Sequence, residues 1–191
     1  FVPILSQAQR LSQSITYAEC GFFPQHQYFY LDKKGVNDQS QLKMDDLCWI
    51  NSEHKRILDK IRSLFFLDVI PHPDSGYIFV PLQVPTDSNV LNHSRFKSGM
   101  QEFIDYIEEL YPDEQLWFKP HPKDRFKDSY YYKLGTSVEG NVNMLIAGAK
   151  KIHGINSSVL YEAACLPPCL PGNLIFQISH SHRKKSIDLV T

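Results

Sequence analysis

Residues Leu116–Pro122 read Leu-Trp-Phe-Lys-Pro-His-Pro and decide the fold prediction. The apolar start predicts a buried strand, and the two prolines hold the intervening His121 in extended backbone, so the strand ends abruptly at polar groups. Tyr77–Asp87 and Lys150–Val159 have the same form, an apolar run followed by polar side chains. We expect these three segments to border one pocket.

The pattern around these segments predicts an α/β lobe. Strands and helices alternate along the chain, which is typical of a doubly wound parallel sheet. Ligands bind such sheets beyond the carboxyl ends of the strands. The predicted elements are strands at Tyr77–Val84, Gln115–Lys119 and Lys150–Ile155, and helices at Ser98–Tyr111, Asn141–Ala149 and Asn156–Cys165.

The preceding residues predict part of a second lobe. Phe1–Arg10 is expected to be a strand end running into a helix, and Ser14–Ala18 and Gln27–Leu31 are expected to be strands. An amphipathic helix is predicted from His54 to Phe66, and a turn-rich linker follows it. We therefore divide the chain into a partial N-terminal, acceptor-side lobe with a hinge (1–70), a donor-binding lobe (77–178) and a tail (179–191).

Composition excludes several classes of protein. The 191 residues are 42% hydrophobic, and 20 Lys and Arg nearly balance 21 Asp and Glu, so no overall charge favours a nucleic-acid partner. No apolar window is long enough for a membrane span, and no signal peptide is evident, which predicts a cytoplasmic location. Cys165 and Cys169 could join His180 and His182 in a zinc site, but reduced thiols are the better interpretation, and we expect no metal.

Two groups of polar residues follow the predicted strands. Asn156-Ser157-Ser158 lies at a helix start, where it could bind an anion or simply cap the helix. Lys119 and His121 suit a phosphate or carboxylate ligand, and the alternative is a turn that happens to contain a histidine.

Three carboxylates are also candidates. Asp87 beside a cationic pocket could act as a base or nucleophile, although a turn aspartate bonding its own backbone is a strong alternative. Glu19 ends a predicted strand before a glycine, but a solvated loop carboxylate is the more common case. For Glu162, on the last helix, a solvated helix face is at least as good an interpretation as ligand contact.

Taken in order, the motifs resemble the bacterial capsular polysaccharide biosynthesis/export family of retaining β-Kdo glycosyltransferases. The resemblance runs from about Tyr17 to Ala164. It is carried by Glu19–Phe23, Leu31–Val36, Val80–Val84 with Asp87, Lys119–Pro122, and Ile155–Val159 with Glu162-Ala163.

The resemblance implies a GT-B architecture of two Rossmann-like lobes and CMP-β-Kdo as donor, with no further cofactor. It implies a glycan or glycolipid acceptor, and it allows a peripheral association with the inner membrane through segments outside this chain. The implied catalytic residues are Asp87 as nucleophile, Glu19 as acid/base or acceptor-activating residue, and His121. The implied donor-binding residues are Gln83, Lys119, His121, Asn156, Ser157, Ser158 and Glu162, with Glu162 touching a ribose.

The chain departs from the family pattern at two places. Leu166–Gly172 is rich in proline, leaving Leu174–Ile178 as the next strand candidate, and most of the N-terminal lobe is missing. We therefore expect a piece of a longer enzyme that is incomplete in its acceptor site. The alternatives are another CMP- or CDP-dependent polymer transferase, such as a polysialyl- or glycerophosphotransferase, and a non-catalytic glycan-binding remnant of the fold.

Overall fold

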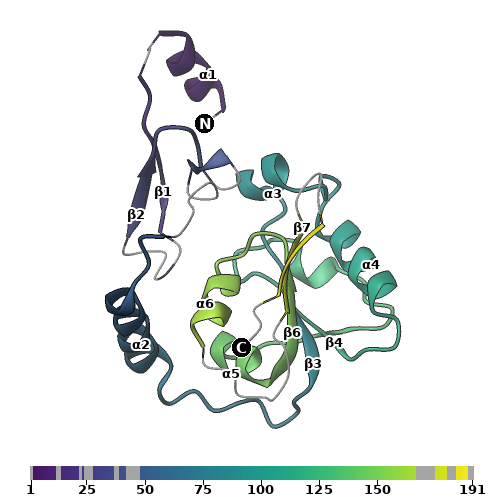
Figure 1. Cartoon of the computed structure of the whole chain (residues 1–191). Coiled ribbons are helices and arrows are strands. Elements are labelled where there is room, and N and C mark those ends of the chain that lie inside the picture. The colour runs from purple at the N-terminus through teal and green to yellow at the C-terminus, as the bar shows by residue number, and fades with distance from the viewer. Residues whose placement is uncertain are drawn as a thin grey trace. The chain divides into compact units, whose positions relative to one another are not determined.

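The computed structural model describes residues 2–11, 14–21, 23, 28–36, 39–41, 48–166, 175–179 and 184–188 (Figure 1). The chain divides into two compact units, residues 1–51 and 52–191. No helix in the described ranges is both long and apolar enough to cross a bilayer.

The first unit contains a helix and a β-hairpin. Helix α1 spans Val2–Leu11, so the predicted helix is confirmed, and the strand end predicted before it is wrong because the helix already includes the apolar start. Strands β1 (Tyr17–Cys20) and β2 (Phe29–Asp32) pair antiparallel. The hairpin begins a few residues later than the sequence suggests.

Asp32 closes the loop that follows the hairpin. Its carboxylate accepts hydrogen bonds from the backbone N–H groups of Lys34, Gly35 and Gln41 and from the Ser40 hydroxyl, at 2.6–3.1 Å. Burial alone would raise the pKa of this carboxyl, but the four donors lower it to about 2. The Leu-Asp-x-x-Gly segment is thus a loop-closing motif held by one ionised side chain.

The second unit is an α/β lobe built on a six-stranded sheet of order β5-β4-β3-β6-β7-β8, in which only β8 is antiparallel to its neighbour. Counted within the lobe, this is the order 3-2-1-4-5-6 of doubly wound sheets. The predicted parallel sheet is confirmed. Its strands are β3 (Tyr77–Pro81), β4 (Leu116–Lys119), β5 (Thr136–Ser137), β6 (Ala149–Gly154), β7 (Ile175–Ser179) and β8 (Lys184–Asp188).

Helices cover both faces of the sheet (Figure 1). On one face α4 (Met100–Leu110) inserts Phe103, Ile104 and Ile107 against Val80 and Phe118. On the other face lie α5 (Val142–Gly148) and α6 (Val159–Cys165), and the Tyr77 hydroxyl donates to the Leu145 carbonyl at 2.7 Å. Successive strand residues point to opposite faces, so burial on both faces explains the uninterrupted apolar runs of β3 and β4.

Several elements lie outside the sequence prediction. Helix α2 (Ser52–Phe66) matches its prediction and belongs to the second unit. The sequence predicted no element for helix α3 (Ser88–His93), and strand β5 lies in a segment expected to be a connection. A six-residue helix with two apolar residues and a two-residue edge strand leave no periodic signal. Strand β8 lies in the segment predicted as a tail. The prolines of 167–172, Cys169, His180 and His182 lie outside the described residues.

Candidate functional site

The candidate site lies where β3, β4 and β6 end. These strands finish at Pro81, Lys119 and Gly154, and the loops after them carry the polar residues singled out from the sequence. In the order 3-2-1-4-5-6 the connections leave β3 and β6 in opposite directions, which opens a crevice between their carboxyl ends. The three predicted strand ends therefore meet at the position where doubly wound sheets bind ligands.

Gln83 and Asn156 join the β3 and β6 loops directly. Gln83 Nε2 donates to Asn156 Oδ1 at 2.6 Å, and the Asn156 backbone N–H donates to Gln83 Oε1 at 3.2 Å. Asn156 Nδ2 also donates to the Asn89 carbonyl of α3 at 2.9 Å. Both side-chain amides are thus engaged within the protein, in a clamp that fixes α3 relative to the start of α6.

Asp87 is the N-cap residue of α3. Its Oδ1 accepts from the Asn89 backbone N–H at 2.7 Å, and its own backbone N–H donates to the Val84 carbonyl at 3.0 Å. These bonds are those of a turn aspartate that bonds the nearby backbone, the alternative given in the sequence analysis, yet they occupy only one carboxylate oxygen. Within the described residues no donor bonds Oδ2, and the side chain is exposed. A capped, exposed and oriented carboxylate is compatible with attack on a ligand in the crevice.

His121 lies in the turn after β4, at the same edge of the sheet as the loop that carries Asp87, because β3 and β4 are parallel neighbours. Its Nδ1 accepts from the Lys123 backbone N–H at 3.1 Å. Burial and then Lys123 lower the pKa of the imidazole, while the carboxylates of Asp124 and Asp87 act in the opposite direction. Lys119, half-buried, accepts at its carbonyl from the Leu82 N–H at 2.9 Å, which ties the β4 end to the β3 end.

Ser157 and Ser158 lead into α6. Ser157 Oγ accepts from the Val159 N–H at 3.3 Å, so Ser157 fulfils the capping role, and the Ser158 side chain forms no capping bond. Glu162, one turn later, is half-buried, and burial raises the pKa of its carboxyl. Glu162 is therefore not the fully solvated helix residue that was the simplest alternative.

Glu19 belongs to the other unit. It is the penultimate residue of β1, lies opposite Tyr30 in the hairpin register, and accepts from the Cys20 N–H at 2.8 Å through Oε1. Its expected role stays a prediction.

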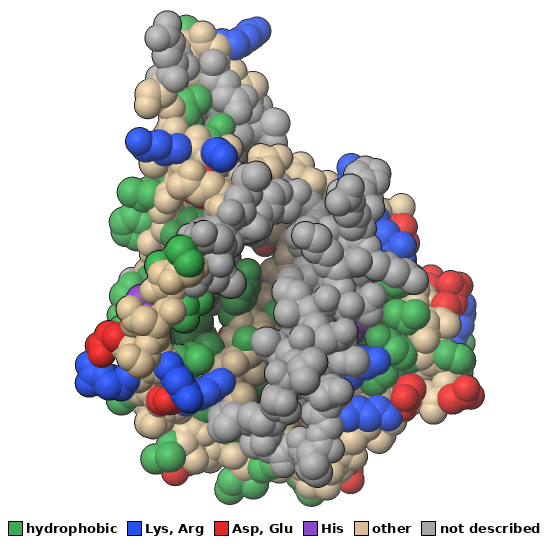
Figure 2. Space-filling view, in the orientation of Figure 1, with side chains coloured by type: hydrophobic (Ala, Val, Ile, Leu, Met, Phe, Trp, Pro, Cys, Tyr) green, Lys and Arg blue, Asp and Glu red, His purple; other side chains and the backbone are tan. Residues whose placement is uncertain are grey.

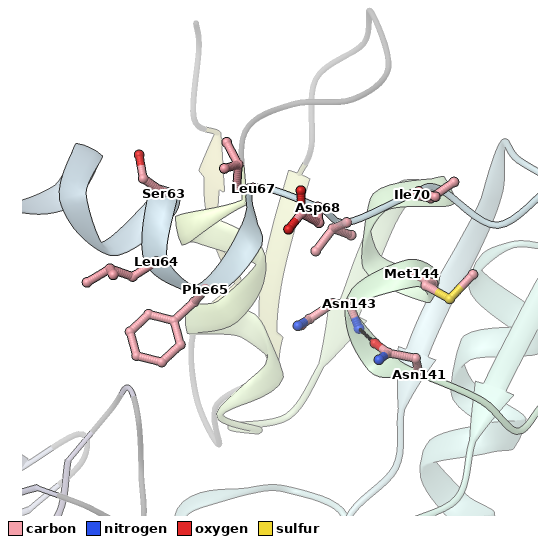
Figure 3. Close-up of a pocket in the computed structure, with 10 residues that line it drawn as sticks. Ser63, Leu64, Phe65, Leu67, Asp68, Ile70, Asn141, Asn143 and Met144 are labelled. Carbon is pink, nitrogen blue, oxygen red and sulfur yellow. Dashed lines mark hydrogen bonds between the residues drawn. The ribbon is translucent and has the colours of Figure 1, made fainter.

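A pocket of about 400 Å³ lies elsewhere in the second unit, between the end of α2, residues 67–70 and the start of α5 (Figure 3). Six of its ten lining residues are apolar, but more of the lining surface is polar than apolar. Asn141 accepts from the Asn143 backbone N–H, and Asp68 is the single charged side chain of the lining. None of the ten lining residues comes from the loops after β3, β4 or β6. A cavity without a cationic side chain does not suit a phosphate ester, so we place the site at the strand ends.

Charge is not concentrated on the visible surface. Figure 2 shows basic and acidic side chains interspersed there, in keeping with the near balance of the composition. An anion site in this lobe must therefore be local, as Lys119 and His121 would make it.

Sequence reasoning missed two contributors to the site. Asn89 enters through its backbone carbonyl, which no side-chain motif can indicate. Asp124 is only 3% exposed and donates its backbone N–H to the His121 carbonyl at 2.9 Å. A buried aspartate three residues after the histidine could be suspected only from the length of the turn.

The sequence model of a family described as "Capsule polysaccharide biosynthesis protein" matches residues 70–164, which confirms the resemblance to a capsule polysaccharide biosynthesis family over those residues. Protein FixF of Sinorhizobium fredii (strain NBRC 101917 / NGR234) is 36% identical in an alignment of 100 residues that covers 48% of this chain and 24% of FixF.

Two solved structures from Thermosulfurimonas dismutans share the fold. KpsC described as a beta Kdo 2,7 transferase has a TM-score of 0.62 at 20% identity, covering 83% of this chain and 58% of its own. KpsC described as a beta Kdo 2,4 transferase has a TM-score of 0.61 at 15% identity, covering 86% and 62%. This chain thus spans less than two thirds of each of these relatives.

Proposed function

We propose, from the premise that residues 70–164 belong to the capsule polysaccharide biosynthesis family, that this lobe binds the nucleotide-sugar donor of a glycosyltransferase. One observation supports the proposal: Asp87, His121 and Asn156-Ser157-Ser158 follow three adjacent parallel strands, at the same edge of the sheet. The KpsC relatives are described as β-Kdo transferases, so CMP-β-Kdo is the proposed donor, a bacterial surface glycan or glycolipid the proposed acceptor, and GT-B the proposed architecture.

The donor is doubly anionic at its reacting end, since the phosphate of CMP and the carboxylate of Kdo flank the same carbon. His121, Lys119 and the hydroxyls of Ser157 and Ser158 are the proposed anchors for these two anions. Cationic and hydrogen-bonding groups offset the repulsion that the Kdo carboxylate presents to an attacking aspartate. Gln83 and Asn156 support this site by holding its two loops together, and Glu162 is the proposed ribose contact.

The proposed reaction has two displacements, the logic of retaining glycosidases. First, Asp87 Oδ2 forms a bond to the anomeric carbon of Kdo while the bond from that carbon to the phosphate oxygen breaks, and CMP leaves with the electron pair. Then an acceptor hydroxyl attacks the same carbon, the carboxylate ester bond breaks, and the hydroxyl proton passes to a base. Glu19 is the proposed base. Two inversions retain the configuration.

The proposal can be tested on the full-length parent protein with CMP-Kdo and a glycan acceptor. With an acceptor present, we expect the wild-type protein to transfer Kdo. Without an acceptor, we expect intact mass spectrometry to detect the protein with one covalently added Kdo. Asp87→Asn should abolish both while keeping α3 capped, because Asn caps a helix as well as Asp does. Asp128→Asn, at an exposed position, is the matched control and should react normally.

The same assay separates the alternatives. Turnover of CDP-glycerol or CMP-sialic acid in place of CMP-Kdo would assign the fold to another polymer transferase. Binding of glycan without turnover of any of these donors would indicate a glycan-binding remnant. Either result would refute Kdo transfer.

A further inference from the structure

A buried aspartate and a tyrosine tether the turn that carries His121 to the core of the lobe. Asp124 is 3% exposed although it lies in a surface turn, and a charged side chain is seldom buried without partners. Its Oδ2 accepts from the Tyr130 hydroxyl at 2.5 Å, and its Oδ1 accepts from the Phe126 backbone N–H at 3.0 Å. Both carboxylate oxygens are therefore used.

The other end of the tether is the Tyr130 ring. It packs against the hydrophobic cluster formed by α4, β3 and β4. Burial, followed by the adjacent Asp124 carboxylate, raises the pKa of Tyr130, so the phenol keeps its proton and acts as a donor. The Tyr130 hydroxyl thereby fixes Asp124 relative to the hydrophobic core of the lobe.

Asp124 in turn holds His121. Its backbone N–H donates to the His121 carbonyl, and the neighbouring Lys123 N–H donates to His121 Nδ1. With Nδ1 as acceptor, the proton of the neutral ring resides on Nε2. Nε2 is then the nitrogen that can donate to an anionic ligand.

We propose that Asp124 and Tyr130 are positioning residues that present His121 Nε2 to the phosphate of the donor. This inference rests on the proposed function. Without the Tyr130 hydroxyl, Asp124 Oδ2 would be left buried and unpaired, and the turn would relieve that cost by moving Asp124 toward water. His121 would move with it, and a ligand contact misplaced by about 1 Å loses most of its value.

The test compares Tyr130→Phe with Tyr131→Phe, which removes the hydroxyl of the exposed neighbouring tyrosine. Isothermal titration of the full-length protein with CMP should show at least a roughly 10-fold rise in Kd for Tyr130→Phe, the effect of a lost hydrogen bond to a charged group. Tyr131→Phe should stay within about 2-fold of wild type. Equal Kd values for the two variants would overturn the inference.

A merely structural role is tested in the background of His121→Ala. If Tyr130 acts through His121, adding Tyr130→Phe to His121→Ala should weaken CMP binding no further. A second loss of similar size would show general damage to the lobe and overturn the inference. Asp124→Ala, which removes both carboxylate acceptors, should behave like Tyr130→Phe.

The imidazole itself gives a readout that needs no ligand. Long-range ¹H–¹⁵N spectra of His121 at high pH should show one tautomer, protonated at Nε2, in wild type and Tyr131→Phe, and a mixture of tautomers in Tyr130→Phe. An unchanged His121 spectrum in Tyr130→Phe would overturn the tether. A wild-type protein that fails to bind CMP would refute the proposed function, and these spectra would still decide the tether.

Discussion

The clamp between Gln83 and Asn156 should make a measurable contribution to stability. Gln83→Ala removes the Nε2–Oδ1 bond at 2.6 Å and the N–H to Oε1 bond at 3.2 Å. Asn156→Ala removes the first of these and the bond to the Asn89 carbonyl. At about 0.5–1.5 kcal/mol for each hydrogen bond, each single variant should lose about 1–3 kcal/mol of unfolding free energy.

The double variant isolates the shared bond. The two single variants together count the Nε2–Oδ1 bond twice, whereas the double variant loses it once. The cycle should therefore give a coupling energy equal to that one bond, about 0.5–1.5 kcal/mol. Urea unfolding followed by circular dichroism measures all four proteins, and Gln115→Ala, on the surface before β4, should change stability by less than about 0.5 kcal/mol.

A coupling energy near zero would refute the clamp as a connection between the β3 and β6 loops. If both single variants lose stability while the coupling energy is near zero, the Gln83 and Asn156 side-chain amides each form hydrogen bonds with other groups in solution. In either case the argument that these loops hold Asp87 and Ser157 at fixed separation would fail.

Other predictions concern the core and the hairpin unit. Burial, then Lys151 and Arg95, lower the pKa of His153 to about 4, so the unfolded chain binds a proton first as the pH falls. The free energy of unfolding should therefore fall by roughly 3 kcal/mol as the pH drops from 6.5 to 4. In urea titrations, His153→Phe should remove this dependence of the unfolding free energy on pH. Gly135→Ala should cost about 1–3 kcal/mol, because its Cβ would lie 2.3 Å from the ring of Phe118, and unchanged thermal unfolding would contradict this. Asp32→Ala should expose residues 33–41 to limited proteolysis, and equal cleavage rates in variant and wild type would argue against its loop-closing role.

The sheet could be predicted because its central strands carry their own signal. β3 and β4 are apolar on both faces, and α4 between them has a clear helical period, so the type and order of these elements follow from the sequence. The short elements could not be predicted. Helix α3 exists because Asp87 caps it and Asn156 bonds its Asn89 carbonyl, and that contact spans 67 residues of sequence.

In the candidate site, too, local sequence patterns indicate residue types but not the contacts between residues that are distant in the sequence. Gln83 and Asn156 were both predicted to bind the donor, and their residue types fit that role equally well. The structure brings them together, with their amides bonded to each other, which no local pattern indicates. Asp124 was not singled out because a turn aspartate is ordinarily solvated, and only the ring of Tyr130, six residues later, explains its burial.

The position of the donor site tests the account most directly. A titration of the ¹⁵N-labelled protein with CMP, followed by backbone amide chemical shifts, locates the site without any assumption about the acceptor. The account predicts shifts concentrated in residues 83–89, 119–124 and 156–160. Shifts confined to residues 63–70 and 141–144, which surround the pocket between α2 and α5, would contradict it. The absence of shifts at millimolar CMP would contradict it as well.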